Sequence, residues 1–119
     1  MTRVVIWVSD LDKSILFYRD LFEEATIYQV ESFASVSNED NEVLLHLAPE
    51  QFRGEVSIGE NNPIKPVFKV QSLENARAVA AHHKVEFQSD SVTHGTTEYL
   101  DGKDPDGHVI QVAVTKNAN

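Results

Sequence analysis

The stretch Asp101-Gly-Lys-Asp-Pro-Asp-Gly-His-Val-Ile-Gln-Val-Ala-Val114 contains a polar turn that leads directly into an apolar strand. In the turn, Asp104-Pro105-Asp106-Gly107, the first aspartate can hydrogen-bond forward, the proline fixes φ and the glycine tolerates a positive φ. Alternate residues of the strand then point to opposite faces. Ile110, Val112 and Val114 share one face, which is predicted to contact a core. Gln111 lies on the other face, where it can meet a ligand.

The length and composition of the chain limit its class. Its 119 residues fit one domain, and they include no cysteine, which excludes disulfides and thiolate metal sites. The formal net charge of −9 disfavours nucleic acid and anionic membranes as partners. Neither a membrane-spanning run nor a signal peptide is evident, so we expect a cytoplasmic protein.

The residue pattern predicts two helices among short strands. One helix begins at Leu11 after a cap at Ser9 or Asp10, ends near Glu23 and carries a stripe of apolar residues. The other spans residues 73–83 and is capped by Ser72. Strands are predicted at residues 3–8, 26–30, 33–37, 43–48, 66–70, 85–88, 96–100 and 109–114.

The order strand, helix, three strands thus occurs twice, and the two copies match at Val8-Ser-Asp-Leu11 and Val70-Gln-Ser-Leu73. We therefore expect one domain over residues 1–119, with a first module at about 1–48 and a second at about 64–115. The polar segment 49–63 is the predicted linker. This order indicates an α+β fold with mixed sheets, in which each copy contributes half of a shared cavity.

Two motifs resemble the vicinal oxygen chelate superfamily, which includes glyoxalase I, bleomycin-resistance proteins and extradiol dioxygenases. One is the Asp-Pro-Asp-Gly turn with its following strand. The other is Val8-Ser-Asp-Leu-Asp-Lys-Ser-Ile-Leu-Phe-Tyr-Arg-Asp-Leu-Phe22, with a Phe-Tyr pair on its helix. Gly95-Thr-Thr97 also resembles glyoxalase I. The resemblance implies two βαβββ modules whose eight strands form a curled mixed sheet around a cleft.

In metal-dependent members of that family, four equivalent strand positions hold mostly His and Glu. By the resemblance these positions are Arg3, His46, Lys65 and Gln111 here, and only His46 is a conventional ligand. Two cations would repel a metal ion by an amount on the order of several kcal/mol at separations of ~4–6 Å. We therefore predict no metal or other cofactor, with a divalent metal as the alternative.

Two further groups of polar residues contain histidines, but each has a simpler structural explanation. His94, Glu98 and His108 are a second candidate metal set, although residues of turns and strand ends are usually solvated. His82-His83 lies at a predicted helix end, where partial positive charge suits the helix dipole, and is assigned no chemistry.

If the repeat is correct, the residues that share a face with the four positions line a cleft, together with Thr97 and Tyr99. Arg3 and Lys65 would pair with an anionic group of a ligand, Trp7 would stack on a ring, and Gln111 would hydrogen-bond. The simpler alternatives are solvated cations, a Trp7 packed in a core or dimer interface, and a structural His46 rather than a general base.

The leading interpretation is a metal-free protein that binds an anionic or aromatic small molecule, similar to the bleomycin-resistance type. The first alternative is a metal-dependent glyoxalase-like lyase or dioxygenase, and the second is a degenerate domain without a ligand. Because small members of the superfamily commonly pair, we expect a homodimer. The ligand itself is not identified by the sequence.

Overall fold

The computed structural model describes residues 2–53 and 64–116, and its elements follow the order predicted from the repeat. The helices are α1 (Leu11–Phe22) and α2 (Leu73–His83). The strands are β1 (Thr2–Val8), β2 (Thr26–Val30), β3 (Phe33–Ser37), β4 (Asn41–Leu47), β5 (Val67–Lys69), β6 (Val92–His94), β7 (Thr97–Lys103) and β8 (Val109–Thr115). The predicted α+β fold with two βαβββ modules is confirmed. Residues 54–63 of the predicted linker lie outside the described residues.

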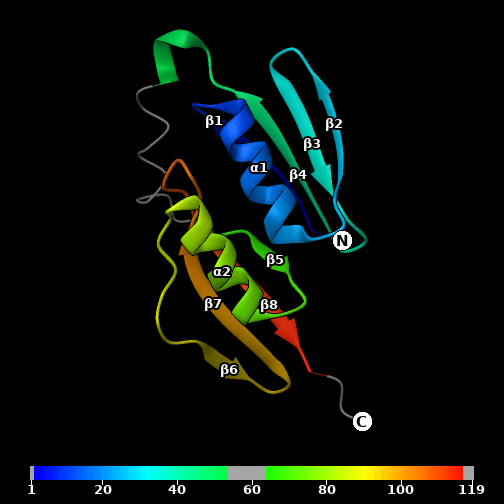
Figure 1. Ribbon diagram of the computed structural model, residues 1–119, viewed down its shortest axis with the longest axis vertical. Coiled ribbons are helices and arrows are strands. Elements are labelled where there is room, and N and C mark those ends of the chain that lie inside the picture. Colours follow the sequence, from blue (N-terminus) through cyan, green and yellow to red (C-terminus); the bar gives the residue numbers. More distant parts are fainter. Residues whose placement is uncertain (1, 54–63, 117–119) are drawn as a thin grey trace.

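The strands form two four-stranded mixed sheets with matching orders, β1-β4-β3-β2 and β5-β8-β7-β6. In each sheet the first strand of the module pairs in parallel with the last, and the other neighbours are antiparallel. Both helices lie in front of their sheets in the view of Figure 1, and the modules follow one another along the long axis. Neither α1 nor α2 covers the opposite face of the sheets, and the described residues contain no other α-helix.

Both helices begin at the capping residues that the repeat aligns. The side chain of Asp10 accepts a hydrogen bond from the backbone N–H of Lys13, and Ser72 accepts one from Asn75. In α1 the predicted apolar stripe is buried against the sheet. Tyr18 and Phe22 of this stripe contact Phe68 of β5, with ring centroids 5.8 and 5.1 Å away. The core thus continues from one module into the other.

The second module departs from the prediction between α2 and β7. Residues 85–88 were expected to form a strand, but within the described part they make one isolated bridge, between Phe87 and Gly102. The strand is β6, which pairs with the other half of β7. Ser89-Asp-Ser91, a polar break, separates the two segments along the same edge of β7. A strand of only three residues carries too little alternation to be recognised from its pattern.

The turn Asp104-Pro105-Asp106-Gly107 has the predicted conformation. Oδ1 of Asp104 accepts hydrogen bonds from the backbone N–H groups of Asp106 and His108, at 2.9 and 3.0 Å. Gly107 has a φ of +82°, the left-handed conformation that glycine adopts without strain. The turn also joins the modules, since Asp104 accepts a hydrogen bond from the Tyr18 hydroxyl at 2.8 Å and Asp106 accepts one from the Ser9 hydroxyl.

Candidate functional site

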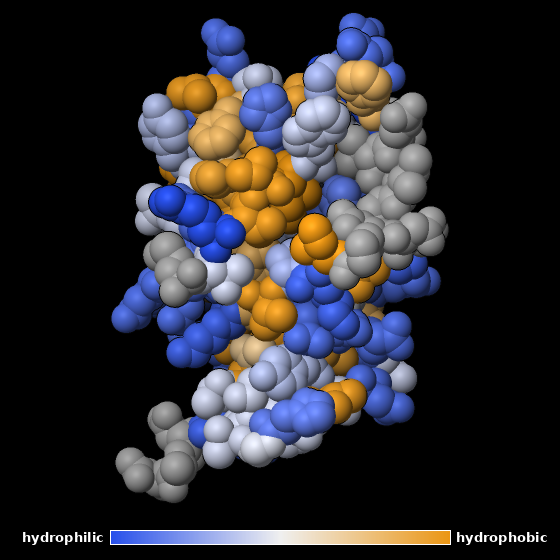
Figure 2. Space-filling model, turned by 180° about the vertical axis from the view of Figure 1, so that it is seen from behind, coloured by the Kyte–Doolittle hydropathy of each residue, from blue (hydrophilic) through white to orange (hydrophobic). Residues whose placement is uncertain are grey.

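The predicted site residues lie on the sheet face that the helices leave uncovered. In β1 the residues on the α1 side, Ile6 and Val8, are buried, whereas Arg3 and Trp7 alternate with them and are exposed. In β8 Ile110 and Val112 are likewise buried. Figure 2, which shows the molecule from behind, displays apolar surface along the middle of this face with polar surface around it. A composition of this kind is typical of small-molecule sites.

The second sheet borders a cavity of about 730 Å³, whose lining includes Lys65, Tyr99 and Gln111. Val67 and Val92 give its wall an apolar part. A cavity of 700 Å³ on the α2 side of β7 contains none of the predicted site residues. We therefore take the first cavity as the centre of the candidate site, because it combines apolar walls with convergent polar groups.

Asp101 organises the polar side of this cavity, and it was missed in the sequence. Nζ of Lys65 donates to its Oδ2 at 3.0 Å, and Nε2 of Gln111 donates to its Oδ1 at 2.9 Å. Asp101 is the cross-strand partner of Gln111 in the pairing of β7 with β8. The signal that could have found it is the period of β7, because Thr97, Tyr99 and Asp101 share a face. The predicted strand ended at Leu100, one residue before Asp101 and three before the end of β7.

The first sheet has a similar pair. Nε of Arg3 donates to Glu42, and Glu42 also accepts from the Ser35 hydroxyl at 3.0 Å. The hydrogen bonds from Arg3 and then Ser35 lower the pKa of Glu42, so the carboxylate stays charged at neutral pH and offsets the guanidinium. The two cations expected to attract an anion are therefore both paired with carboxylates, Arg3 with Glu42 and Lys65 with Asp101.

The two aromatic positions on the first sheet have neighbours of their own. Trp7 stacks on Phe52 with 6.2 Å between the ring centroids, and its side chain remains 48% exposed. His46 lies opposite Trp7 in the register of β1 with β4 and contacts the edge of Phe33. Trp7 also borders a smaller cavity of 360 Å³ at the junction of the modules. Arg3 and His46 line neither this cavity nor that of Lys65.

The four positions that the resemblance assigns as ligands do not fit a metal ion. Two hold cationic groups, Arg3 and Lys65, which cannot ligate a metal and already bind carboxylates. His46 is the only imidazole among them, and Gln111 is committed to Asp101. First-row divalent ions prefer imidazole and carboxylate ligands, which this set does not bring together.

The second candidate metal set does not assemble either. His94 contacts Tyr99 at 6.1 Å between ring centroids, Glu98 accepts a hydrogen bond from Ser91, and Nε2 of His108 lies 3.1 Å from the backbone oxygen of Trp7. Within residues 2–53 and 64–116, the group of three potential ligands that converges lies elsewhere, on the two helices.

A family model matches the chain in sequence, whereas individual curated proteins do not. The family model described as "Glyoxalase/Bleomycin resistance protein/Dioxygenase superfamily" matches residues 1–112. No curated protein matches the chain in sequence.

Several solved structures share the fold. A fosfomycin resistance protein, FosX, from Listeria monocytogenes in complex with Mn(II) and sulfate is 15% identical, with a TM-score of 0.71 and coverage of 98% of this chain and 90% of that one. FosX from Mesorhizobium loti is 11% identical, with a TM-score of 0.70 and coverage of 98% and 92%. A glyoxalase/bleomycin resistance protein/dioxygenase from Alicyclobacillus acidocaldarius is 16% identical, with a TM-score of 0.62 and coverage of 97% and 90%. At these identities the likeness concerns the fold alone.

In the described part of the chain, no helix is both long enough and apolar enough to cross a membrane.

Proposed function

Because the chain belongs to the glyoxalase/bleomycin resistance protein/dioxygenase superfamily, we propose that it binds a small molecule on the uncovered sheet face, without a catalytic metal there. The observation that supports this is the cavity in which Lys65, Gln111 and Asp101 form a polar group beside Tyr99 and apolar side chains. Such a cavity suits a ligand with a flat apolar part and one polar end.

The ion pairs refine the expected ligand. An anionic group that reaches Lys65 must compete with Asp101, whose Oδ2 already lies 3.0 Å from the ammonium group. An amide or hydroxyl group can instead donate to Asp101 and accept from Gln111 without displacing a charge. The proposed ligand is therefore an aromatic molecule with a neutral polar group. We expect the corresponding aromatic carboxylate to bind more weakly, because it must compete with Asp101 for Lys65.

The test uses matched pairs of ring compounds, each an aromatic carboxamide and the corresponding carboxylate, titrated calorimetrically into chelator-treated protein. Binding of the amide that weakens at least about tenfold in Gln111→Ala, a loss of about 1.4 kcal/mol, supports the proposal. Lys13→Ala is the control, because Lys13 is an exposed cation on α1, away from the sheet face.

Other results would change the interpretation. Preferential binding of the carboxylate, lost in Lys65→Ala, would return the protein to the anion-binding class. Binding that requires Mn²⁺ and survives Gln111→Ala would overturn the proposal in favour of a metal-dependent enzyme. If none of the ring compounds binds, with or without metal, the proposed ligand class is wrong and the degenerate-domain alternative gains support.

We also propose that a second copy of the chain covers the apolar part of this face. Val5 and Trp7 of β1 and Val67 of β5 are 61%, 48% and 36% exposed, and each of these strands is an edge strand of its sheet. Apolar surface gathered in this way is typical of interaction sites rather than of isolated surface residues. The proposed pairing would also narrow the cavity that contains Lys65.

A further inference from the structure

Three potential metal ligands converge on the helical side of the molecule, away from the sheet face. They are Asp20 of α1 and the last two residues of α2, His82 and His83. One ligand atom from each side chain lies within 4.8 Å of the other two. The sequence placed the two histidines at a helix end but gave no reason to associate them with Asp20, which is 62 residues before His82.

The three ligand atoms lie close together, and a metal ion would replace the hydrogen bond that now joins His83 to Asp20. Nε2 of His83 lies 2.7 Å from Oδ2 of Asp20, and the rings of His82 and His83 lie at nearly a right angle with 5.0 Å between their centroids. In a tetrahedral zinc site, where each ligand atom is about 2.0–2.1 Å from the metal, neighbouring ligand atoms are about 3.3 Å apart. Small side-chain rotations would therefore bring the three atoms to this spacing.

Two of the ligands are already held in place by neighbours. Nη2 of Arg19 lies 2.9 Å from Oδ1 of Asp20, which leaves Oδ2 directed toward His83. The His83 side chain is only 11% exposed and contacts Phe17 edge-on, at 5.7 Å between ring centroids. Supporting contacts of this kind orient metal ligands before the metal arrives. His82 is exposed, so solvent can complete the coordination.

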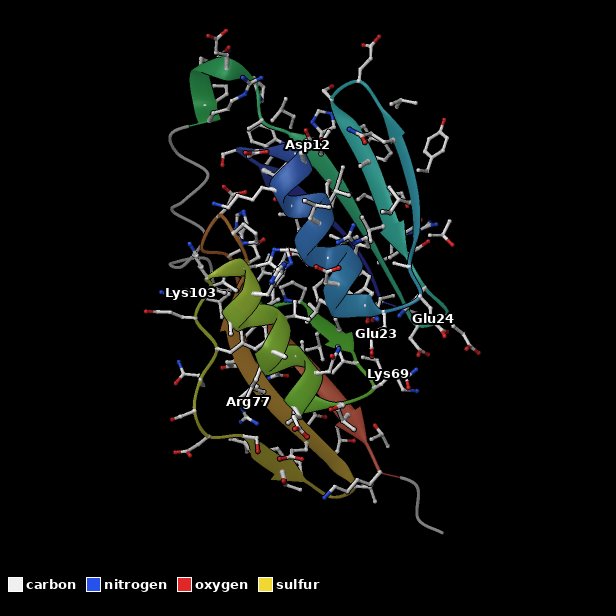
Figure 3. The ribbon with its side chains drawn as sticks, viewed as in Figure 1. Asp12, Glu23, Glu24, Lys69, Arg77 and Lys103 are labelled. Atoms are coloured by element: carbon white, nitrogen blue, oxygen red, sulfur yellow. The ribbon has the colours of Figure 1, made fainter. Side chains whose placement is uncertain are left out.

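The local charge also favours a cation. Asp20 and His82 border a hollow of 480 Å³ that is lined further by Arg19, Glu23 and Glu24. The residues that line the hollow thus carry three carboxylates and one guanidinium, and Figure 3 shows Glu23 and Glu24 at the end of α1. A divalent ion entering this hollow would meet a net negative surface, which raises its local concentration.

We propose that Asp20, His82 and His83 form a binding site for a divalent transition-metal ion, with Zn²⁺ the best match. Two imidazoles and one carboxylate suit Zn²⁺, whereas Mg²⁺ prefers oxygen ligands alone. The site joins α1 of the first module to α2 of the second, so its occupation stabilises the packing of the modules. It is independent of the ligand proposed for the sheet face.

The test is a calorimetric titration of the chelator-treated, dialysed 119-residue chain with ZnCl₂ and, separately, with MgCl₂. We expect saturable binding of one Zn²⁺ per chain, a rise in the thermal midpoint, and no response to Mg²⁺. Removal of an outer-shell partner alone typically weakens a zinc site by about 10- to 100-fold, so His82→Gln should weaken binding by at least about tenfold. His82 is exposed, so this variant should keep its fold.

His94→Gln is the matched control, because His94 is also exposed but belongs to β6. The proposal is overturned if Zn²⁺ fails to bind, if His82→Gln binds as tightly as the wild type, or if His94→Gln loses the site. Imidazole ¹⁵N spectra provide a second measurement that does not depend on a variant of the partly buried His83. Zn²⁺ should shift the signals of His82 and His83 and leave that of His94 unchanged, and the reverse pattern would contradict the proposal.

Discussion

Tyr18 shows how one side chain can tie the two ends of the domain together. It is fully buried, and its hydroxyl donates to Asp104, which is itself buried in the final turn. Burial, followed by the negative charge of Asp104, raises the pKa of Tyr18 well above its ordinary value of 10.0. Burial likewise raises the pKa of Asp104, although His108 and the Tyr18 hydroxyl act in the opposite direction. Replacing either Tyr18 or Asp104 should therefore destabilise the folded chain.

Replacing Tyr18 by Phe leaves Oδ2 of Asp104 without its hydroxyl donor. We expect the free energy of unfolding at neutral pH to fall by about 1–3 kcal/mol, as measured by urea denaturation. Tyr28→Phe is the control, because Tyr28 is 62% exposed and the change should be within about 0.5 kcal/mol. Equal losses in the two variants would show that the contact with Asp104 contributes little.

The same residue predicts an alkaline response. Because the folded chain favours the neutral phenol, the stabilising contribution of Tyr18 is complete below its unfolded pKa of about 10 and is lost as the pH rises further. The 295-nm absorbance of the wild type minus that of Tyr18→Phe should therefore stay flat until alkaline unfolding and then rise. A rise centred near pH 10 in folded protein would contradict the raised pKa.

Gly102 is required by the ring of Phe87. A Cβ added to Gly102 would lie 2.2 Å from Cδ1 of that ring, so a side chain and the ring cannot share the space. We expect Gly102→Ala to lower the free energy of unfolding by about 1–3 kcal/mol, the usual cost of overpacking. The double variant with Phe87→Leu should recover part of this loss, and additive losses would exclude the proposed clash.

At the scale of elements, the two sheets are connected by an amide side chain. Asn41 at the start of β4 is fully buried, and its Nδ2 donates to the backbone oxygen of Lys69 at 2.7 Å. Its Oδ1 accepts from the backbone N–H of the same residue at 2.9 Å. The side chain thus satisfies both backbone groups at the end of β5, as a neighbouring strand would.

Removing this connection should loosen the packing of the modules. Asn41→Ala leaves both backbone groups of Lys69 without these partners, and we expect a loss of about 2–4 kcal/mol in urea denaturation. Glu39→Ala is the control, because Glu39 is exposed in the same turn. A loss no larger than that of the control would mean that the Asn41 side chain contributes little to holding the modules together.

At the scale of the whole molecule, the uncovered face and the helical face differ in character. Exposed apolar residues occur on both, but they gather on the sheet side around Val5 and Trp7. We expect sedimentation equilibrium to find dimers that Trp7→Glu dissociates. Leu16→Glu should not, because Leu16 is similarly exposed, at 43%, but lies on α1. A wild-type monomer at every concentration would rule out the proposed pairing.

The fold could be predicted because its signals are local. The stripe of α1, the caps and the Asp104–Gly107 turn each depend on residues within a few positions of one another. The candidate site was harder to predict from the sequence. Lys65, Tyr99 and Gln111 could be assigned to one cavity through the repeat, but the pairing of Lys65 with a carboxylate could not be predicted. Lys65 and Asp101 are 36 residues apart, and only the three-dimensional arrangement pairs them. The same holds for Asp20 and the histidines of α2.

The contacts between α1 and the final turn also constrain how the protein is made. Tyr18 meets Asp104 only after 86 further residues have been translated, and Ser9 waits 97 residues for Asp106. At 5–20 residues per second, the first delay is roughly 4–17 s. During this time the nascent first module presents Tyr18 without the final turn, and until Phe68 has been translated it also presents Tyr18 and Phe22 without that ring. We therefore expect chaperones to protect the exposed apolar residues of the first module mainly while the chain is still growing on the ribosome.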